Sequence, residues 1–296
     1  MKEIILITGD SGSLAKEVKK TLSEQYFIRT LTTKKNKVNK ETVFYWDIDK
    51  EILDVDALKD CNHIIHLSGY PILKPWTQRN KELMYTSRVK GAELLYEKCK
   101  KHKIKTFITA SAIGYYGLEA EGCKDETSIV GEDWLANLAN DWELAADLFK
   151  NIGSRVVKMR IPLLFSNNSG FLKYTLLSMK YGLAVMLGNI NNPINWIHIK
   201  DAARFVGESI NNSKFYGAYN LSSMRPTTQK EIVDFFKKEM YPYCIRIKIP
   251  ISLVKFFIGE RSLILNTKTR LNIDKLRKMK FKNKYQKLED LTTISN

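Results

Sequence analysis

The chain has 296 residues, 44% of them hydrophobic, and a formal net charge of +16 at pH 7. This length and apolar content can fill a large core, which excludes a disordered or fibrous protein. The longest apolar stretch, Ile249–Gly259, contains Lys255 and is shorter than the roughly 20 residues that span a bilayer, so we expect no membrane partner. No segment of signal-peptide character begins the chain, and we expect a cytoplasmic protein.

The cysteines and the basic residues each admit a structural interpretation. The four cysteines stand far apart, with no C-x-x-C pair and no histidine at metal-ligand spacing, so we expect reduced cysteines and no metal site. The lysines alternate with Asn, Asp and Glu instead of forming a basic stripe, which makes a nucleic-acid partner unfavoured. A polyanion-binding tail at 268–287, where the basic residues are densest, remains an alternative.

The first half of the chain alternates between apolar runs and amphipathic segments. Ile-rich residues 3–8 predict a buried strand, and Leu14, Val18 and Leu22 predict a helix over 13–25. Further strands are predicted at 27–32, 42–48, 63–68, 106–111 and 155–161, and further helices at 51–60, 78–101 and 132–151. This alternation predicts an α/β fold with a doubly wound parallel sheet of the Rossmann type.

The pattern changes after residue 165. A strand-like segment at 217–222 is followed by a mostly helical end from Thr228 onward. We expect residues 1–165 to form a dinucleotide-binding domain, to which segments of about 195–222 return. Residues 166–296 are expected to form a smaller, mostly helical substrate lobe that interlaces with it.

Two glycines directly follow the first predicted strand. Gly9 and Gly12, with Ala15 after them, form G-x-x-G-x-x-A at the start of a helix, where backbone N–H groups favour a pyrophosphate. The alternative is an ordinary structural turn. Ser11 and Ser13 add hydroxyl donors, whereas the Asp10 carboxylate would repel an anion unless it points away.

The end of the second predicted strand bears on the choice of cofactor. An acid here would bind an adenosine ribose 2′-OH, but the sequence has Thr32, Thr33 and Lys34. A 2′-phosphate fits these side chains better, so NADP is favoured over NAD.

Several segments together resemble a known family. The segments "TGDSGSLA", "HLSGYPI", "SRVKGAELL", "ITASAIGYYG", "DWELAA" and "NWIHIKD" occur in the order and spacing of the extended or atypical short-chain dehydrogenase/reductases. More narrowly, the chain is similar to the NAD-dependent epimerase/dehydratase-like group. The resemblance covers nearly the whole chain.

The resemblance implies a set of functional positions. The implied cofactor-binding residues are Gly9, Ser11, Gly12, Ser13 and Leu14 for the pyrophosphate, Thr32, Thr33 and Lys34 for the adenosine phosphate, Asp47 and Ile48 for the adenine, and Leu67, Ser68 and Gly69 for the ribose and pyrophosphate. Arg88, where extended members carry an asparagine, and Arg160 complete this set. Ser111 stands near the catalytic serine of the superfamily.

The sequence departs from the superfamily at its catalytic pair. A Tyr-x-x-x-Lys pair places an ammonium group under a phenol, lowering its pKa for proton exchange. Leu138 and Trp142 occupy those positions here, so the usual proton relay is absent. Tyr115 and Tyr116 are the candidate replacements; the alternative is that they only line a pocket. Asp141 and Glu143 are interpreted as helix or pocket-rim residues.

Trp196 and His198 alternate on a strand-like segment and are candidate substrate contacts, or else core residues beneath a loop. The favoured function is an NADP-dependent oxidoreductase or epimerase acting on a small hydroxyl or carbonyl substrate, possibly sugar-derived. The alternative is a catalytically degenerate NADP(H) sensor. Helices at 78–101 and 132–151 could pair in a homodimer or remain in solvent.

Overall fold

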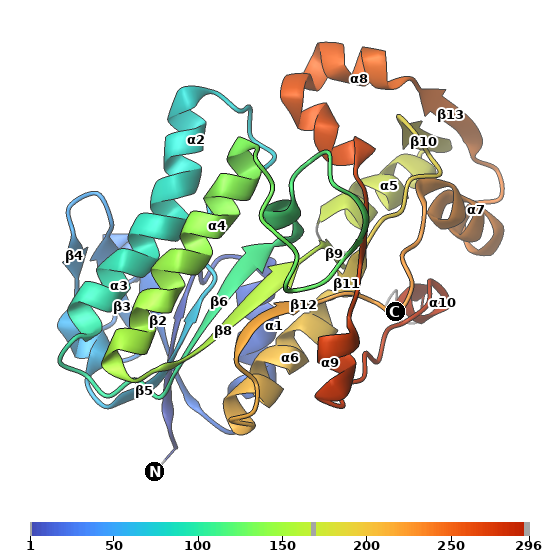
Figure 1. Ribbon diagram of the computed structural model, residues 1–296. Helices are drawn as coiled ribbons and strands as arrows, with labels where there is room; N and C mark the ends of the chain where they lie inside the picture. The colour runs from blue at the N-terminus through green and yellow to red at the C-terminus, as the bar shows by residue number, and fades with distance from the viewer. Residues whose placement is uncertain (1, 167–169, 293–296) are drawn as a thin grey trace.

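A large, mostly parallel sheet forms the centre of the molecule (Figure 1). The computed structural model describes residues 2–166 and 170–292. The strand order is β12-β8-β6-β5-β1-β2-β3-β4, and only the β3–β4 pair is antiparallel. The strands are β1 (Ile4–Thr8), β2 (Phe27–Thr32), β3 (Val43–Asp47), β4 (Ile52–Leu53), β5 (Cys61–His66), β6 (Thr106–Ala112), β8 (Arg155–Ile161) and β12 (Gly217–Asn220).

Helices cover both faces of this sheet. One face packs against α1 (Ser13–Leu22) and α6 (Ile199–Asn211), and the other against α3 (Gly91–Cys99) and α4 (Trp134–Asp147) (Figure 1). Within β1, Ile5 and Ile7 belong to the first core and Leu6 to the second. Strands buried on both faces read as continuous apolar runs, which is why the sequence predicts them well. The predicted α/β doubly wound fold is confirmed.

A smaller lobe follows β8 along the chain. Its core packs α5 (Gly170–Lys180) and α7 (Gln229–Glu239) against β10 (Leu183–Leu187), through Met179, Met186 and Phe236 among others, and β10 pairs in parallel with the more exposed β13 (Ile245–Ile249). Its elements and connections are β9 (Leu163–Phe165), α5 (Gly170–Lys180), β10 (Leu183–Leu187), β11 (Trp196–His198), α7 (Gln229–Glu239), β13 (Ile245–Ile249), α8 (Ile251–Ile258), β14 (Lys268–Leu271) and α10 (Glu289–Thr292). Helix α9 (Asp274–Lys278) packs instead on the core of the central sheet, through Leu276. Both β13 and β14 form where mostly helix was expected, because each pairs with a strand remote in sequence.

The predicted helix at 51–60 is wrong. The structure has the short strand β4 and a 3₁₀ turn, Val55–Leu58, in its place. Glu51 and Asp60 both adopt positive φ, at 54° and 58°, which no α-helix allows. The Asp54 carboxylate accepts the Asp56 N–H at 3.2 Å and so stabilises the turn locally.

The C-terminal segment is fastened to α6 by a buried carboxylate. Asp201, fully buried in the first turn of α6, accepts the backbone N–H groups of Lys284 and Tyr285, each at 2.9 Å. The Tyr285 ring also lies on His198, with 3.8 Å between ring centroids. These contacts join residues that are more than 80 positions apart in the chain.

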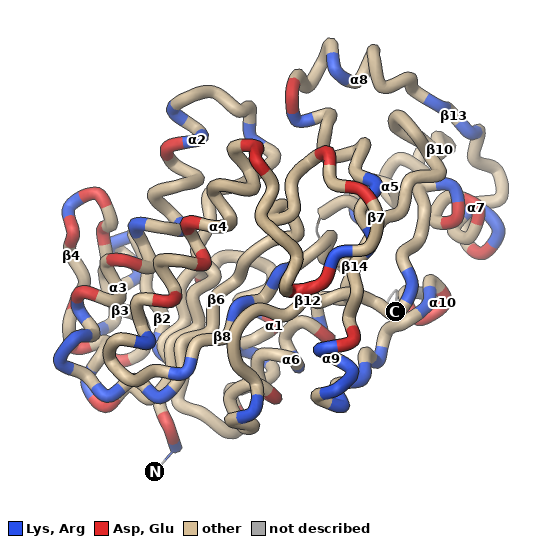
Figure 2. The backbone as a smooth tube through the Cα atoms, viewed as in Figure 1, with Lys and Arg blue, Asp and Glu red and all other residues tan. Residues whose placement is uncertain are grey.

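The basic segment 268–287 is part of the folded structure. Lys268 pairs with Glu121 across β14 and β7 (Glu121–Lys124), and Lys275 donates to the carbonyls of Tyr216 and Ala218. Figure 2 shows Lys and Arg spread over both lobes with Asp and Glu among them. No helix in the described ranges is long and apolar enough to cross a bilayer.

Candidate functional site

The turn between β1 and α1 is open to solvent. Gly9 has a φ of +74°, and a Cβ there would lie 2.6 Å from the carbonyl oxygen of Leu67, so only glycine fits. Ser11, Gly12 and Ser13 are exposed, while Leu14 is buried under the helix. Gly12 is the N-cap of α1, and no side chain in the described part of the chain caps it. The first N–H groups of α1 are therefore left for an external acceptor.

Charges near this turn favour an anion. The first turn of α1 contains no acidic residue, and the positive end of the helix dipole points at the turn. The Asp10 carboxylate forms an ion pair with Lys19 of α1, and this ammonium group compensates its negative charge. The open cradle and the free N–H groups fit the diphosphate of a dinucleotide.

A buried histidine holds the adjacent loop in place. The hydroxyl oxygen of Thr8 accepts the backbone N–H groups of Leu67 (3.1 Å) and Ser68 (3.2 Å), and it contacts His66 Nδ1 at 2.9 Å. His66 Nε2 lies 3.0 Å from the carbonyl oxygen of Arg88, so Nε2 carries the proton and donates it. Burial lowers the pKa of His66 to about 4 and keeps it neutral.

The predicted adenosine residues lie at the carboxyl ends of β2 and β3 or directly after them, on the same edge of the sheet. Thr33 and Lys34 are exposed, and the Lys34 N–H donates to Thr32 Oγ1 at 3.2 Å. Asp47 accepts the Tyr45 hydroxyl at 3.1 Å. Ile48 packs against the core beneath α3. No acid stands among residues 32–35, so these positions present only hydroxyl and ammonium groups.

Arg88 occupies a π-helical turn between α2 (Gln78–Tyr85) and α3. Its Nη1 donates to the carbonyls of Tyr70 (3.0 Å) and Met84 (3.2 Å), and its guanidinium lies 5.3 Å from the Trp142 ring centroid. A Cβ at Gly69 would be 2.9 Å from Nη2, so the cation reaches the loop after β5. No carboxylate in the described ranges pairs with Arg88, whose pKa burial lowers to about 10.

Ser111, Glu143 and Arg160 form one buried network. Glu143 Oε1 accepts from Ser111 Oγ at 2.8 Å, and Arg160 donates to both carboxylate oxygens, from Nε at 2.8 Å and from Nη2 at 3.0 Å. Ser111 and Arg160 face each other across the β6–β8 pair, and Glu143 reaches them from α4. Although burial acts to lower the pKa of Arg160, the hydrogen bond and charge of Glu143 raise it above its ordinary value, so Arg160 stays a cation.

This network bears on the sequence interpretations of Glu143 and Arg160. Glu143 lies on helix α4, one of the two places that the sequence interpretation allowed, and it is buried at the centre of the network beside Arg160 instead of at a pocket rim. The Arg160 guanidinium, predicted to bind cofactor, is engaged by protein groups, and its contact with a cofactor stays a prediction. The sequence signal available for Glu143 was its place in "DWELAA", one residue after Trp142.

The two adjacent tyrosines have different environments. The buried Tyr116 hydroxyl accepts from Arg160 Nη1 at 3.0 Å and lies 2.7 Å from the Asn220 side-chain oxygen. Burial raises the pKa of Tyr116 to about 12. Tyr115 is half-buried, and its ring lies directly on the Arg160 guanidinium, 3.5 Å from ring centroid to guanidinium carbon. Tyr116 is thus held in the protein, whereas Tyr115 borders the surface.

The remaining predicted residues pack in cores. Leu138 and Trp142, at the positions of the usual Tyr and Lys, lie on the buried face of α4. Trp196 is buried and stacks on Phe165 at 4.9 Å between centroids, and His198 is buried at the N-cap of α6, with its pKa lowered by burial to about 4. Both lie on strand β11, and their contact with a substrate stays a prediction.

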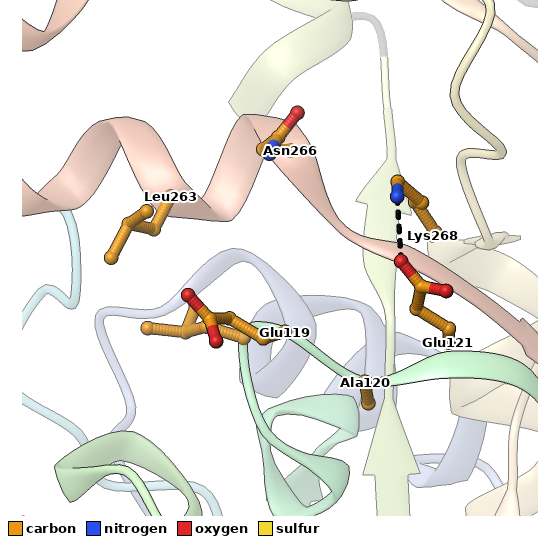
Figure 3. Close-up of a pocket in the computed structure, with 7 residues that line it drawn as sticks. Glu119, Ala120, Glu121, Leu263, Asn266 and Lys268 are labelled. Carbon is orange, nitrogen blue, oxygen red and sulfur yellow. Dashed lines mark hydrogen bonds and ion pairs between the residues drawn. The ribbon is translucent and has the colours of Figure 1, made fainter.

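A pocket of about 290 Å³ opens between the two lobes (Figure 3). It is lined by residues 118–121, which follow the turn that carries Tyr115, and by Leu263, Asn266 and Lys268. Figure 3 shows three charged groups in its lining, of which Glu121 and Lys268 pair with each other while Glu119 lies apart from them. The pocket contains none of the residues predicted from sequence.

The strand order, the glycine turn at the end of β1 and the loops at the carboxyl edge of the sheet define a Rossmann-type α/β protein. The family model of the NAD-dependent epimerase/dehydratase family matches residues 5–222, and the chain belongs to this family. The resemblance drawn from the sequence motifs is therefore confirmed.

Individual relatives agree with this assignment. Epimerase family protein SERP0438 of Staphylococcus epidermidis is 27% identical over 290 residues, covering 96% of each chain. Epimerase family protein ML0860 of Mycobacterium leprae is 27% identical over 236 residues, covering 79% of this chain and 76% of that protein.

Solved structures share the fold. Human epimerase family protein SDR39U1 (isoform 2) with NADPH superposes with a TM-score of 0.83 at 20% identity, covering 97% of both chains. The UDP-glucuronic acid 4-epimerase of Bacillus cereus, in complex with UDP-glucuronic acid and NAD, gives a TM-score of 0.80 at 16% identity, covering 98% of this chain and 97% of that one. At these identities the likeness shows a common fold.

Proposed function

We propose that this chain is an NADP(H)-dependent oxidoreductase or epimerase that acts on a small hydroxyl or carbonyl compound. The carrying observation is the turn Gly9–Ser13, whose free N–H groups and open backbone fit a diphosphate. Thr32, Thr33 and Lys34 would hold the adenosine 2′-phosphate, which favours NADP over NAD. The NADPH of the human relative's structure and the NAD of the bacterial epimerase support a nicotinamide cofactor.

The chemistry is proposed to depend on Tyr115. A bound nicotinamide supplies or accepts hydride. Tyr115 would donate a hydrogen bond or a proton to the substrate oxygen, with the Arg160 cation under its ring in place of the usual lysine. The pocket of Figure 3, which opens beside this turn, is the proposed place for the rest of the substrate.

Binding is tested by a titration of the purified chain with NADPH, followed by fluorescence. Gly12→Glu places a carboxylate at the helix N-terminus, and we expect at least ~100-fold weaker binding from repulsion and lost access. Thr21→Glu adds the same charge in the last turn of α1 and serves as the control. Equal affinity in the wild type and Gly12→Glu would remove the proposed diphosphate site.

A second candidate is a protein that binds the dinucleotide without turnover. The observation that favours it is the burial of Leu138 and Trp142, together with the Ser111 hydroxyl being bound to Glu143. A screen of sugar-nucleotide, steroid and aldehyde substrates with NADPH separates the two functions. Hydride transfer to any of them excludes a pure sensor, while tight NADPH binding without transfer to any favours it.

A further inference from the structure

Helix α8 presents apolar side chains to solvent on the face where a surface helix is normally polar. Phe256 is 82% exposed, Phe257 73% and Leu253 47%, whereas Val254 is buried. Positions i, i+3 and i+4 share one helix face, so these three side chains form a continuous outward ridge, which we call the α8 ridge. Exposed apolar patches of this kind mark interaction surfaces.

The other side of α8 anchors it to the lobe. Ile251 packs on the β10 turn, since a Cβ at Gly188 would lie 3.1 Å from its Cδ1 atom. The following 3₁₀ segment is tied to the Rossmann domain by Arg261 Nη1, which donates to the Leu73 carbonyl at 2.6 Å. Figure 1 shows α8 at the outer end of the smaller lobe. The ridge therefore protrudes while its base is held.

The charges on β13 and α8 are positive, and Glu260, which follows α8, pairs with Lys81 at 3.8 Å. Residues 245–258 contain Arg246, Lys248 and Lys255 and no acid. Arg246 pairs with Asp234, but neither lysine forms an ion pair with any described residue. Figure 2 shows basic positions along β13 and on α8, and an acidic position where α8 ends. The whole chain carries a net charge of +16, so its field also favours an anionic surface.

We propose, in departure from the expectation of no membrane partner, that the α8 ridge docks this protein on an anionic lipid bilayer, with Phe256 and Phe257 in the headgroup region and Lys248 and Lys255 near lipid phosphates. A convex ridge of flexible apolar side chains flanked by lysines is the pattern of helices that lie in a bilayer interface. A protein partner would need a matching groove and polar rim contacts, for which α8 supplies only Ser252 and Lys255. The stretch is too short to span a bilayer but long enough to lie on it.

The test is flotation of the purified full-length chain with vesicles. The wild type is expected to float with vesicles of phosphatidylcholine mixed with phosphatidylglycerol, and far less with phosphatidylcholine alone. Replacing both rings, Phe256→Ser with Phe257→Ser, should reduce the bound fraction about tenfold. The control is Tyr216→Ser, because Tyr216 is an aromatic side chain that is 67% exposed but lies far from α8. Its neighbour Phe215 accepts a hydrogen bond from Arg155 Nη1 through its carbonyl, at the amino edge of the sheet, opposite the edge near α8.

The charge contribution is tested separately. Lys248→Glu with Lys255→Glu should lower binding about tenfold or more and abolish its salt dependence, whereas Lys214→Glu should leave it unchanged. Thermal unfolding verifies folding, and Phe256→Ser alone is used if the double variant unfolds. Equal flotation of wild type and ridge variants overturns the proposal. If the ridge variants change only the molecular mass measured by light scattering, the ridge binds a second copy of this chain. If they change only the KM, the ridge contacts the substrate. Either result overturns the proposal of bilayer docking.

Discussion

Two regions at the carboxyl edge of one sheet treat their polar groups in opposite ways. At the turn Gly9–Ser13, backbone donors face outward and no described side chain caps them. In the network of Ser111, Glu143 and Arg160, each polar group is buried and bonded to another. Ligand binding requires donors that the protein leaves unsatisfied, so the first region is suited to bind and the second to hold the scaffold. The proposed chemistry is assigned to a group at the edge of this network, Tyr115.

The largest expected effect comes from opening the network. Glu143→Ala would leave the Arg160 guanidinium buried without its counter-ion, and we expect the free energy of unfolding to fall by about 3–5 kcal/mol. Urea denaturation measures this change. Glu119→Ala, at an exposed carboxylate, should change it by less than about 0.5 kcal/mol. A similar small loss for Glu143→Ala would mean that the network does not hold the scaffold.

The next effect concerns the histidine behind the binding turn. Burial lowers the pKa of His66 from its ordinary 6.5 to about 4. As the pH is lowered, His66 therefore takes up a proton in the unfolded chain before it does so in the folded chain. This contribution to stability is therefore complete above pH 6.5 and is lost as the pH falls toward 4, about 3 kcal/mol in total. Denaturation at pH 7 and pH 4 should show a smaller difference for His66→Gln than for the wild type. An unchanged difference would show that His66 does not titrate in this way.

A smaller effect should separate the two tyrosines. Tyr115→Phe removes the proposed donor, and we expect kcat to fall about 100-fold with the best substrate of the screen, while NADPH affinity is unchanged. Tyr116→Phe should instead lower the free energy of unfolding by about 1–2 kcal/mol, because it removes a buried hydroxyl bonded to Arg160 and Asn220. The proposed role of Tyr115 fails if its variant retains full turnover.

The smallest effect tests the choice of cofactor at the binding region. Lys34→Glu should weaken NADPH about tenfold and leave NADH nearly unchanged, since only NADPH carries the 2′-phosphate. Calorimetric titration with each cofactor measures the ratio. Lys37→Glu is the control, because it makes the same change of charge three residues later, in the exposed turn Lys35–Lys37. An equal loss in both variants would indicate a general electrostatic field instead of a phosphate contact.

The sequence predicted the fold where burial repeats locally. The strands at 27–32 and 155–161 have the predicted bounds, because apolar residues between turns leave little choice. The helix at 51–60 failed because two residues with positive φ have no reliable signature in composition. Strand β13 was missed because its only strand partner, within the part of the chain described, is β10, about 60 residues earlier.

The site was predictable only where it is contiguous. The turn Gly9–Ser13 consists of five consecutive residues, so its pattern can be recognised in the sequence. The network instead joins residues from three elements: Ser111 and Glu143 are 32 positions apart, and Glu143 and Arg160 are 17 positions apart. No pattern in the sequence around Glu143 indicates that its side chain faces β6 instead of solvent. Trp196 and His198 were read from an alternating strand, but alternation does not say which side contains a ligand and which a core.

The bonds from Asp201 to the backbone of Lys284 and Tyr285 have a consequence for biosynthesis. A nascent chain that has emerged only as far as residue 280 contains every strand of the sheet, yet Asp201 would be a buried carboxylate without these two donors. The emerging protein should therefore remain open to proteases on the ribosome and become resistant only after the final segment has emerged.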